Sequence, residues 1–336
     1  MSAPGSVLVT GGAGYIGSHV VLALRAAGWP VVVLDDLSSG RLRPLHRDCA
    51  LVIGDVADRS TVAAALRRHD VVAVIHLAAS IVAPASVRRP LPYYRNNLAA
   101  SLGLLEACVG HGVAAFVLSS TAAVYGSPTR SPVGEDAPTV PINPYGWSKL
   151  MVERLLADAA AAHDLPFVVL RYFNVAGADP EGRAGQAETG PAHLIRVALD
   201  VALGRRPELP IYGTDYPTVD GTCVRDFVHV SDLAEAHRAA LDHLLAGGAS
   251  AVLNCGYGRG FSVRQVVAAV ERVTGRRVAT RPAPRRPGDA AEVVADASRI
   301  RSLLGWRPRL DDLELMIAHA FAWRRRRAAE LSEALG

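Results

Sequence analysis

The stretch "VTGGAGYIGSH" (residues 9–19) decides the fold of this 336-residue chain. It follows the apolar run "SVLV" and leads into the helical pattern "SHVVLALRAAG". Gly11, Gly14 and Gly17 let the backbone approach a pyrophosphate closely, and the N-terminus of the following helix offers its N–H groups to the anion. The stretch therefore predicts the first strand–turn–helix unit of a dinucleotide-binding fold.

Two adjacent carboxylates support this interpretation about twenty residues further on, where dinucleotide-binding folds place an acid for the ribose. The second predicted strand, "VVVLD" (31–35), ends in Asp35, and Asp36 follows it. Carboxylates at this position bind ribose hydroxyls and repel a 2′-phosphate, so the pair favours NAD over NADP. Arg41 and Arg43 could attract such a phosphate, but we expect them in a surface loop.

The alternation of strands and helices predicts an α/β fold with a Rossmann-type, doubly wound parallel sheet. The strand-like runs are almost continuously apolar, as in strands that are covered on both faces. After about residue 175, Gly, Pro and polar residues become frequent between helical segments. We therefore expect an NAD-binding domain over 1–175, with segments near 222–256 returning to it, and a smaller mixed α/β domain for the substrate over 176–336. The remaining strands are predicted at 6–10, 51–54, 71–78, 114–120 and 167–173, and the later helices near 192–203, 231–245, 262–274 and 311–327.

Short motifs stand at the predicted carboxyl ends of three further strands, where ligands bind in such sheets. In "GDV" (54–56), Asp55 is expected to accept a hydrogen bond from an adenine amino group. In "HLAA" (76–79), Ala78 and Ala79 are small enough for close packing against the cofactor. "SSTAAVYG" (119–126) places three consecutive hydroxyls at the same edge.

The segment "NPYGWSKL" (143–150) sets a tyrosine and a lysine four residues apart at the start of a predicted helix, with Pro144 in its first turn. Tyr145 and Lys149 then share one face and point towards Thr121. A free tyrosine has a pKa near 10, but a nearby ammonium and the positive nicotinamide ring favour the phenolate. Tyr145 can then take a proton from a substrate hydroxyl while hydride leaves to NAD. Thr121 would hold the oxygen, and Lys149 would also bind the nicotinamide ribose.

The composition excludes several other classes of protein. The net charge is +4 and the pI near 9.0, without a basic stripe interleaved with aromatics, so we expect no nucleic-acid partner. The four cysteines are scattered and form no CxxC pair, which argues against a metal site and a disulfide framework. There is no signal-peptide pattern, and no apolar run approaches the roughly 20 residues of a membrane span. We therefore expect a cytoplasmic protein without a membrane partner.

Taken together, the motifs identify a resemblance that runs over almost the whole chain. "VTGGAGYIGSH", "SSTAAVYG", "NPYGWSKLMVE", "LRYFNVAGA" and "DYPTVDGTCVRDFVHV" are similar to segments of the extended short-chain dehydrogenase/reductase family, and the last two resemble the UDP-hexose 4-epimerases within it. The resemblance implies tightly held NAD and a sugar whose 4-hydroxyl Tyr145 deprotonates. The 4-keto sugar would turn about its diphosphate linkage before hydride returns, which inverts C4 and interconverts UDP-glucose and UDP-galactose.

The resemblance also implies which residues contact the two ligands. The cofactor would contact Gly11, Gly14, Tyr15, Ile16, Gly17, Asp35, Asp36, Leu37, Asp55, Val56, Leu77, Ala78, Ala79, Asn96, Ser119, Tyr145, Lys149, Tyr172 and Phe173. The substrate would contact Thr121, Tyr145, Asn174, His193, Leu194, Tyr212, Arg225, Arg286, Asp289 and Val293. Among these, Arg225 and Arg286 would clamp the diphosphate, Asp289 would bind the uridine ribose and Tyr212 would pack against uracil.

Three positions depart from the pattern of the family. Ile81 stands where known members have a lysine that touches NAD, so we expect weaker retention of the cofactor. Thr121 replaces the commoner serine but keeps the hydroxyl. Val293 replaces a bulky tyrosine of some members, which leaves room at C2 of the sugar, so N-acetylated sugars are expected to fit.

Other functions on the same fold are less well supported. A 4,6-dehydratase needs an acid and a base after Thr121, where this chain has Ala122 and Ala123. An NAD-sensing regulator would not need both Tyr145 and Lys149. A 4-epimerase of a UDP-pentose or UDP-uronate uses the same machinery and stays open as the alternative. Helices in 90–110 and 145–163 carry apolar faces, and the resemblance implies that they pair in a homodimer.

Overall fold

The computed structural model describes residues 5–187, 193–286 and 289–333. Its largest element is a seven-stranded sheet in which all neighbouring strands are parallel, with the order β10-β6-β5-β4-β1-β2-β3. Six of these strands follow the predicted runs closely, and the seventh joins them when the chain returns after the second half. The strands are β1 (Ser6–Thr10), β2 (Val31–Asp35), β3 (Ala50–Ile53), β4 (Val71–His76), β5 (Ala115–Thr121), β6 (Phe167–Tyr172) and β10 (Ala251–Cys255).

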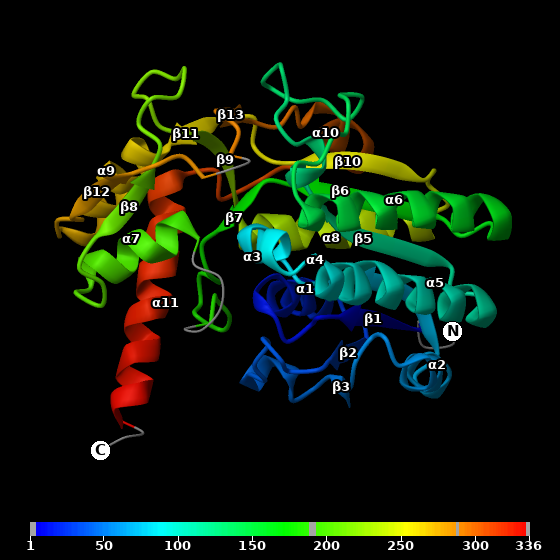
Figure 1. Cartoon of the computed structure of the whole chain (residues 1–336). Coiled ribbons are helices and arrows are strands. Elements are labelled where there is room, and N and C mark those ends of the chain that lie inside the picture. The colour runs from blue at the N-terminus through cyan, green and yellow to red at the C-terminus, as the bar shows by residue number, and fades with distance from the viewer. Residues whose placement is uncertain (1–4, 188–192, 287–288, 334–336) are drawn as a thin grey trace.

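Helices cover both faces of this sheet (Figure 1). On one face lie α1 (Tyr15–Ala26) and α8 (Val230–Leu245), and on the other lie α2 (Arg59–Arg68), α5 (Ala100–His111) and α6 (Pro144–His163). The alternation of β1 shows why its three central residues are all apolar: Val7 and Val9 belong to the core on the first face, and Leu8 to the core on the second. A strand buried on both faces has no solvent-facing positions for polar residues.

The order of the strands creates the site for a ligand. From β1 the chain moves outward through β2 and β3, and it then crosses to β4 and continues in the opposite direction. The loops that follow β1 and β4 therefore diverge, and doubly wound sheets bind their ligands at such a change of direction.

The second half of the chain forms smaller sheets beside the large one (Figure 1). β9 (Val224–His229) is their centre, because it pairs with β7 (Asn174–Ala176), β11 (Gly260–Ser262) and β13 (Glu292–Val293). β8 (Leu209–Tyr212) and β12 (Thr280–Ala283) form a parallel pair. These short strands are absent from the sequence-based prediction. The accompanying helices are α7 (Leu194–Ala202), α9 (Val263–Thr274), α10 (Ser298–Leu304) and α11 (Leu313–Glu333).

Short helices connect the main elements near the carboxyl edge of the large sheet. They are η1 (Pro44–His46), α3 (Ala83–Arg88), α4 (Pro90–Tyr93), the π-helix η2 (Tyr94–Ala99) and η3 (Ala122–Tyr125). Within the described ranges, no helix combines the length and the apolar character that crossing a membrane requires.

Candidate active site

The glycine turn after β1 packs its backbone directly against the backbone of the loop after β4 and of α1. Gly11 has a φ of 70°, and a Cβ built on it would lie 2.8 Å from the backbone N of Ala78. A Cβ on Gly17 would lie 2.1 Å from the carbonyl oxygen of Gly11, so α1 rests directly on the turn. Gly14 precedes α1 without a side-chain cap, which leaves the first N–H groups of the helix for another acceptor. This cradle fits the pyrophosphate of a dinucleotide.

The carboxylate of Asp35 shapes the neighbouring loop. Its Oδ2 accepts a hydrogen bond from the backbone N of Ala13 at 2.9 Å, and its Oδ1 accepts one from the backbone N of Leu37 at 2.9 Å. Each oxygen keeps a lone pair, which suits a ribose hydroxyl. Asp36 is exposed and accepts from Ser38.

Arg43 lies in the loop before η1, as expected, but its guanidinium is not free. Its Nη1 donates to Ser18 Oγ at 2.7 Å and its Nη2 donates to the carbonyl of Gly185 at 2.9 Å. The guanidinium also lies 5.6 Å from the ring centroid of Trp323. Both terminal nitrogens of the Arg43 guanidinium are therefore hydrogen-bonded, one to α1 and one to the second half of the chain. Arg41 is exposed.

The other residues expected at the cofactor follow the same strand ends. Asp55 is exposed just after β3, and Val56 beside it is buried. Residues 77–79 are half-buried directly after β4, and Ile16 is half-buried in the first turn of α1. The hydroxyl of Tyr15 donates to the carbonyl of Gly177 at 2.7 Å, which ties α1 to the segment after β7.

Tyr145 is placed by the start of α6. Asn143 caps this helix by accepting a hydrogen bond from the backbone N of Gly146 at 2.9 Å, and the backbone N of Tyr145 donates to Ser86 Oγ at 3.1 Å. Burial raises the pKa of Tyr145 to about 12, while a hydrogen bond with Thr121 acts in the opposite direction. The structure thus joins the predicted base to the predicted hydroxyl at the end of β5.

Lys149 lies one helical turn further along the same face and is buried. Burial lowers the pKa of its ammonium to about 8, and the charge of Glu153 raises it. A buried cation next to a tyrosine stabilises the phenolate. The segment therefore supplies one of the two positive charges that favour the phenolate, the other being the nicotinamide ring of a bound cofactor.

The three hydroxyls that end β5 have different environments. Ser119 Oγ lies 2.6 Å from Nε2 of His237 on α8, and it also forms a hydrogen bond with Tyr172, whose pKa is raised by burial. Ser120 donates to Glu153 on α6. Only Thr121, of these three, lies beside Tyr145, and its Oγ1 also accepts from the backbone N of Ala123 at 3.1 Å. Phe173 follows β6 and is buried.

Asn97 is a site residue that the sequence analysis missed. Its buried amide accepts from the backbone N of Ser80 at 2.7 Å and donates to Ser148 Oγ at 2.9 Å. Ser148 Oγ in turn donates to the carbonyl of Tyr145 at 2.8 Å, so Asn97 ties the loop after β4 to the helix of the base. Its neighbour Asn96, predicted at the cofactor, is exposed and donates to Ser80 Oγ at 2.9 Å. The sequence feature that could have indicated Asn97 is the pair of adjacent asparagines in a helical segment.

Residues expected at the substrate gather around β9. Arg225 on β9 is the register partner of Val293 on β13, and Asn174 on β7 pairs with Phe227 two residues along β9. The guanidinium of Arg286 lies 3.6 Å from the ring centroid of Tyr212. The structure therefore brings the two residues predicted for diphosphate and uracil into a cation–π contact.

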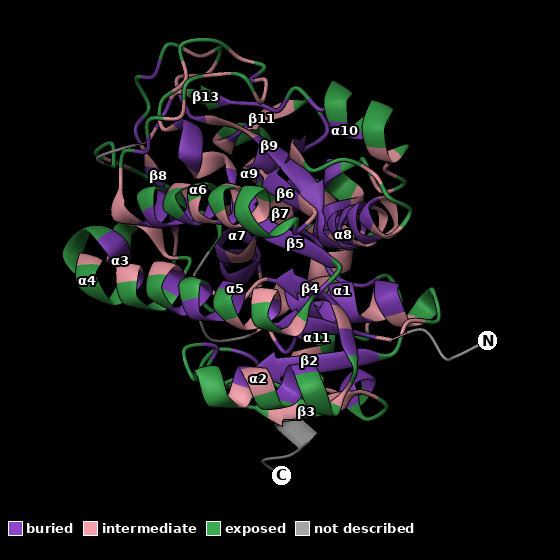
Figure 2. Cartoon of the chain, turned by 90° about the vertical axis from the view of Figure 1, so that its right-hand side faces the viewer, coloured by how far each residue is buried: buried purple, intermediate pink, exposed green. Residues whose placement is uncertain are grey.

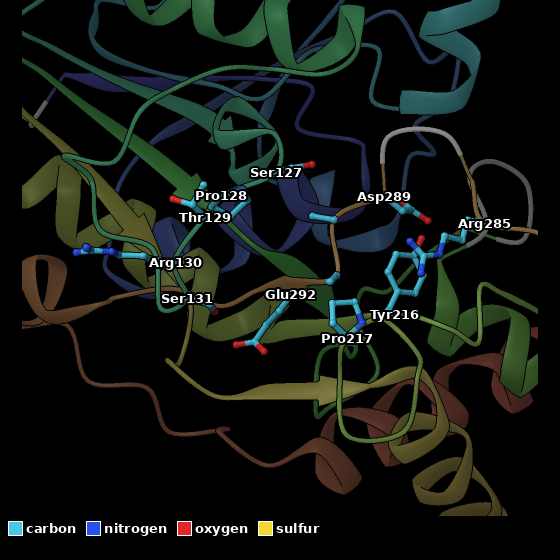
Figure 3. A pocket seen from close by; sticks show the side chains of 12 residues that line it. Ser127, Pro128, Thr129, Arg130, Ser131, Tyr216, Pro217, Arg285, Asp289 and Glu292 are labelled. Atoms are coloured by element: carbon cyan, nitrogen blue, oxygen red, sulfur yellow. The ribbon is translucent and has the colours of Figure 1, made fainter.

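A cavity of about 450 Å³ opens between residues 127–131 and residues 289–292 (Figure 3). Tyr216 and Arg285 also line it, and Arg285 is paired with Asp215. Asp289 thus faces this cavity. His193, which heads α7 beside the half-buried Leu194, lines a separate, smaller pocket.

Comparisons with known proteins agree with this geometry. Residues 7–256 match the NAD dependent epimerase/dehydratase family. The UDP-glucose 4-epimerase of Azospirillum brasilense is 58% identical over 319 residues, covering 95% of this chain and 92% of that protein. A crystal structure of UDP-glucose-4-epimerase from Stenotrophomonas maltophila, with bound NAD and formylated UDP-arabinopyranose, is 42% identical with a TM-score of 0.94, covering 97% of this chain and 100% of that one. The UDP-Glc/GlcNAc 4-epimerase of Campylobacter jejuni is 44% identical with a TM-score of 0.84, covering 96% and 100%.

Proposed function

Since the chain belongs to the NAD dependent epimerase/dehydratase family, we propose that it inverts C4 of a UDP-hexose and interconverts UDP-glucose and UDP-galactose. The observation that carries the proposal is the contact of Tyr145 with Thr121, one helical turn from the buried Lys149, at the same edge of the sheet as the glycine turn. Relatives whose names state this activity cover nearly the whole chain, which supports the assignment.

The chain's own residues would hold and move the proton. Bound NAD would accept hydride from C4 of the sugar and return it. Tyr145 would take the proton of the 4-hydroxyl, Thr121 would hold the oxygen, and Lys149 would keep the phenolate form accessible. The glycine cradle and the carboxylate of Asp35 would hold the cofactor from the other side of the crevice.

The second half of the chain would bind the nucleotide. We propose that Arg225 and Arg286 bind the diphosphate, because guanidinium groups match phosphate oxygens in pairs. Tyr212 would pack against uracil, and Asp289 would accept hydrogen bonds from the uridine ribose. This assigns the cofactor to residues 1–175 with the returning segment near 222–256, and the substrate chiefly to residues 176–336.

Val293 is proposed to widen the range of sugars. It is buried on β13, next to Arg225 in register, and its side chain is much smaller than a tyrosine. The Campylobacter jejuni relative, named for both UDP-Glc and UDP-GlcNAc, supports the idea. Val293→Tyr should then abolish turnover of UDP-GlcNAc and leave turnover of UDP-galactose largely intact. Equal loss of both activities would contradict this role.

The deciding experiment is turnover of UDP-galactose, UDP-GlcNAc, UDP-xylose and UDP-glucuronate by the purified chain without added NAD. Conversion of UDP-galactose into UDP-glucose, lost in Tyr145→Phe, would support the proposal. Activity on the pentose or uronate alone would keep the mechanism and overturn the substrate. Activity that appears only with added NAD would show that Ile81, which is exposed, weakens retention of the cofactor.

We also propose that the protein is a homodimer. The neighbouring helices α3 to α6 carry exposed residues (Figure 2), and the apolar ones among them define a surface. Its exposed side chains are Val87, Leu91, Leu102, Trp147 and Met151. Light scattering should give twice the chain mass, and a Leu102→Glu, Met151→Glu double variant should be monomeric. Leu303→Glu on α10, an exposed leucine outside this surface, is the matched control.

A further inference from the structure

The side chain of Glu153 is buried in the interior between α6 and the large sheet. Arg171 on β6 donates to it from Nη2 at 2.6 Å and from Nε at 3.1 and 3.2 Å. Ser120 on β5, the register partner of Arg171, donates to the same carboxylate. Every one of these groups donates to Glu153, so the carboxylate acts as an acceptor in an ion pair with Arg171.

Glu153 also continues the face of α6 that carries the proton-transfer residues. Tyr145, Lys149 and Glu153 are spaced four residues apart, so they follow one another along one side of the helix. All three are buried, where charges interact more strongly than in water. Glu153 is one turn from Lys149 and two turns from Tyr145. Its negative charge therefore acts more strongly on Lys149 than on Tyr145.

We propose that Glu153 is a positioning residue that shifts the proton shared by Tyr145 and Lys149 towards the lysine. This inference rests on the proposed function, because it concerns the same base. When the pair holds a single proton, that proton sits either on the ammonium, which leaves an active phenolate, or on the phenol, which leaves an inactive pair. A negative charge nearer to the lysine favours the first arrangement.

Four described titratable groups around this face are neutral and supply no such charge. His76 on β4 is kept neutral, since burial and the nearby Lys149 lower its pKa to about 3. Burial raises the pKa of Tyr93 on α4, of Tyr125 on η3 and of Tyr172 on β6, so these phenols are neutral as well. Arg171 is positive and is paired with Glu153. Its Nη1 also donates to the hydroxyl of Tyr125 and to the backbone carbonyl of residue 135.

The chemistry of the pair predicts a specific signature for Glu153→Gln. The alkaline limb of the kcat profile for UDP-galactose should move down by about one pH unit, and the plateau should fall several-fold. Activity well below the plateau should change little, because Lys149 is protonated there in both proteins. KM should stay within about twofold, since Glu153 is buried between α6 and the sheet.

Two further variants separate charge from structure. Ser120→Ala removes a hydrogen bond to Glu153 but leaves the charge of Glu153 in place. The alkaline limb of its kcat profile should therefore stay at the pH of the parent protein. Glu153→Gln with Arg171→Met removes both charges and avoids a buried, unpaired arginine if the single variant folds poorly. The proposal expects a downward shift in this double variant too, smaller than in Glu153→Gln because the opposing charge of Arg171 is removed as well.

A spectroscopic titration makes the test independent of turnover. The near-ultraviolet tyrosinate absorbance of the NAD-loaded chain, minus that of its Tyr145→Phe variant, reports ionised Tyr145. At the plateau pH, this signal should be smaller in Glu153→Gln. An unshifted limb with an equal loss of activity at every pH, and an unchanged tyrosinate signal, would overturn the proposal. Absence of parental turnover with a changed signal would instead overturn the proposed function alone.

Discussion

Replacing Gly17 by alanine tests whether the nucleotide-binding turn depends on backbone contact with α1. A Cβ at this position would lie 2.1 Å from the carbonyl oxygen of Gly11 and 2.8 Å from Cα of Gly12. Both neighbours are backbone atoms, so neither can rotate away as the end of a side chain can. Non-bonded carbon contacts are comfortable at about 3.5 Å, so the first turn of α1 has to move by about 1 Å.

This displacement has two measurable consequences. Overpacking of this kind costs about 1–3 kcal/mol of unfolding free energy. The N–H groups that face the pyrophosphate move with the helix, and a misplacement of about 1 Å weakens a positioned interaction by roughly tenfold to a hundredfold. Urea unfolding without NAD measures the first effect, and titration with NAD measures the second.

Gly110→Ala is the matched control, because Gly110 lies in α5 and a Cβ there meets nothing within 4 Å. Alanine should stabilise that helix by about 0.5–1 kcal/mol. Unfolding free energy and NAD affinity that stay unchanged in Gly17→Ala would refute the reasoning, as would equal losses in both variants.

Three further changes test the site. Tyr145→Phe should lower kcat by about 10²–10⁴ with little change in KM, in initial-rate assays with UDP-galactose, and intact turnover would place the base elsewhere. Burial lowers the pKa of Lys149 from its ordinary value of 10.5 to about 8, so between these pH values the unfolded chain binds more protons. The stability of the NAD-free parent should therefore rise relative to Lys149→Met from about pH 8 to 10.5 in urea unfolding, and a constant difference would contradict the burial of a charged lysine. Arg171→Met leaves Glu153 buried without its cation and should cost about 3–5 kcal/mol in the same assay; a loss below about 1 kcal/mol would show that water reaches the carboxylate.

The strands of the large sheet were predictable because each carries a strong local signal. "SVLVT" and "VVVLD" coincide with β1 and β2 as observed, since residues buried on both faces form continuous apolar runs. The short strands around β9 lack such runs. Their two or three ladder residues are held by partners far away in sequence, as when β7 and β9 pair.

The amides and hydroxyls near the base show a different limit. Asn96 and Asn97 are adjacent, and both stand in a π-helix whose extra residue per turn decides which amide points inward. Helical periodicity assumes a regular turn, so it cannot choose between them. Likewise, the residues of β5 alternate between the faces of the sheet, which sends Ser119 and Ser120 to helices on opposite sides.

The sequence by itself determined the dinucleotide turn, the parallel sheet and the pairing of Tyr145 with Lys149, because each rests on a spacing of a few residues along the chain. Only the tertiary structure showed that Glu153 pairs with Arg171 one turn from Lys149 and that the buried Asn97 bonds to Ser148 on the helix of the base. It also showed that Arg43 donates hydrogen bonds to Ser18 on α1 and to Gly185. Burial and contact between segments far apart set these features. The free energy of a buried charge or amide depends on the dielectric around it and on its hydrogen-bond and ionic partners. Neither the dielectric nor the partners can be deduced from the residues next to it in sequence.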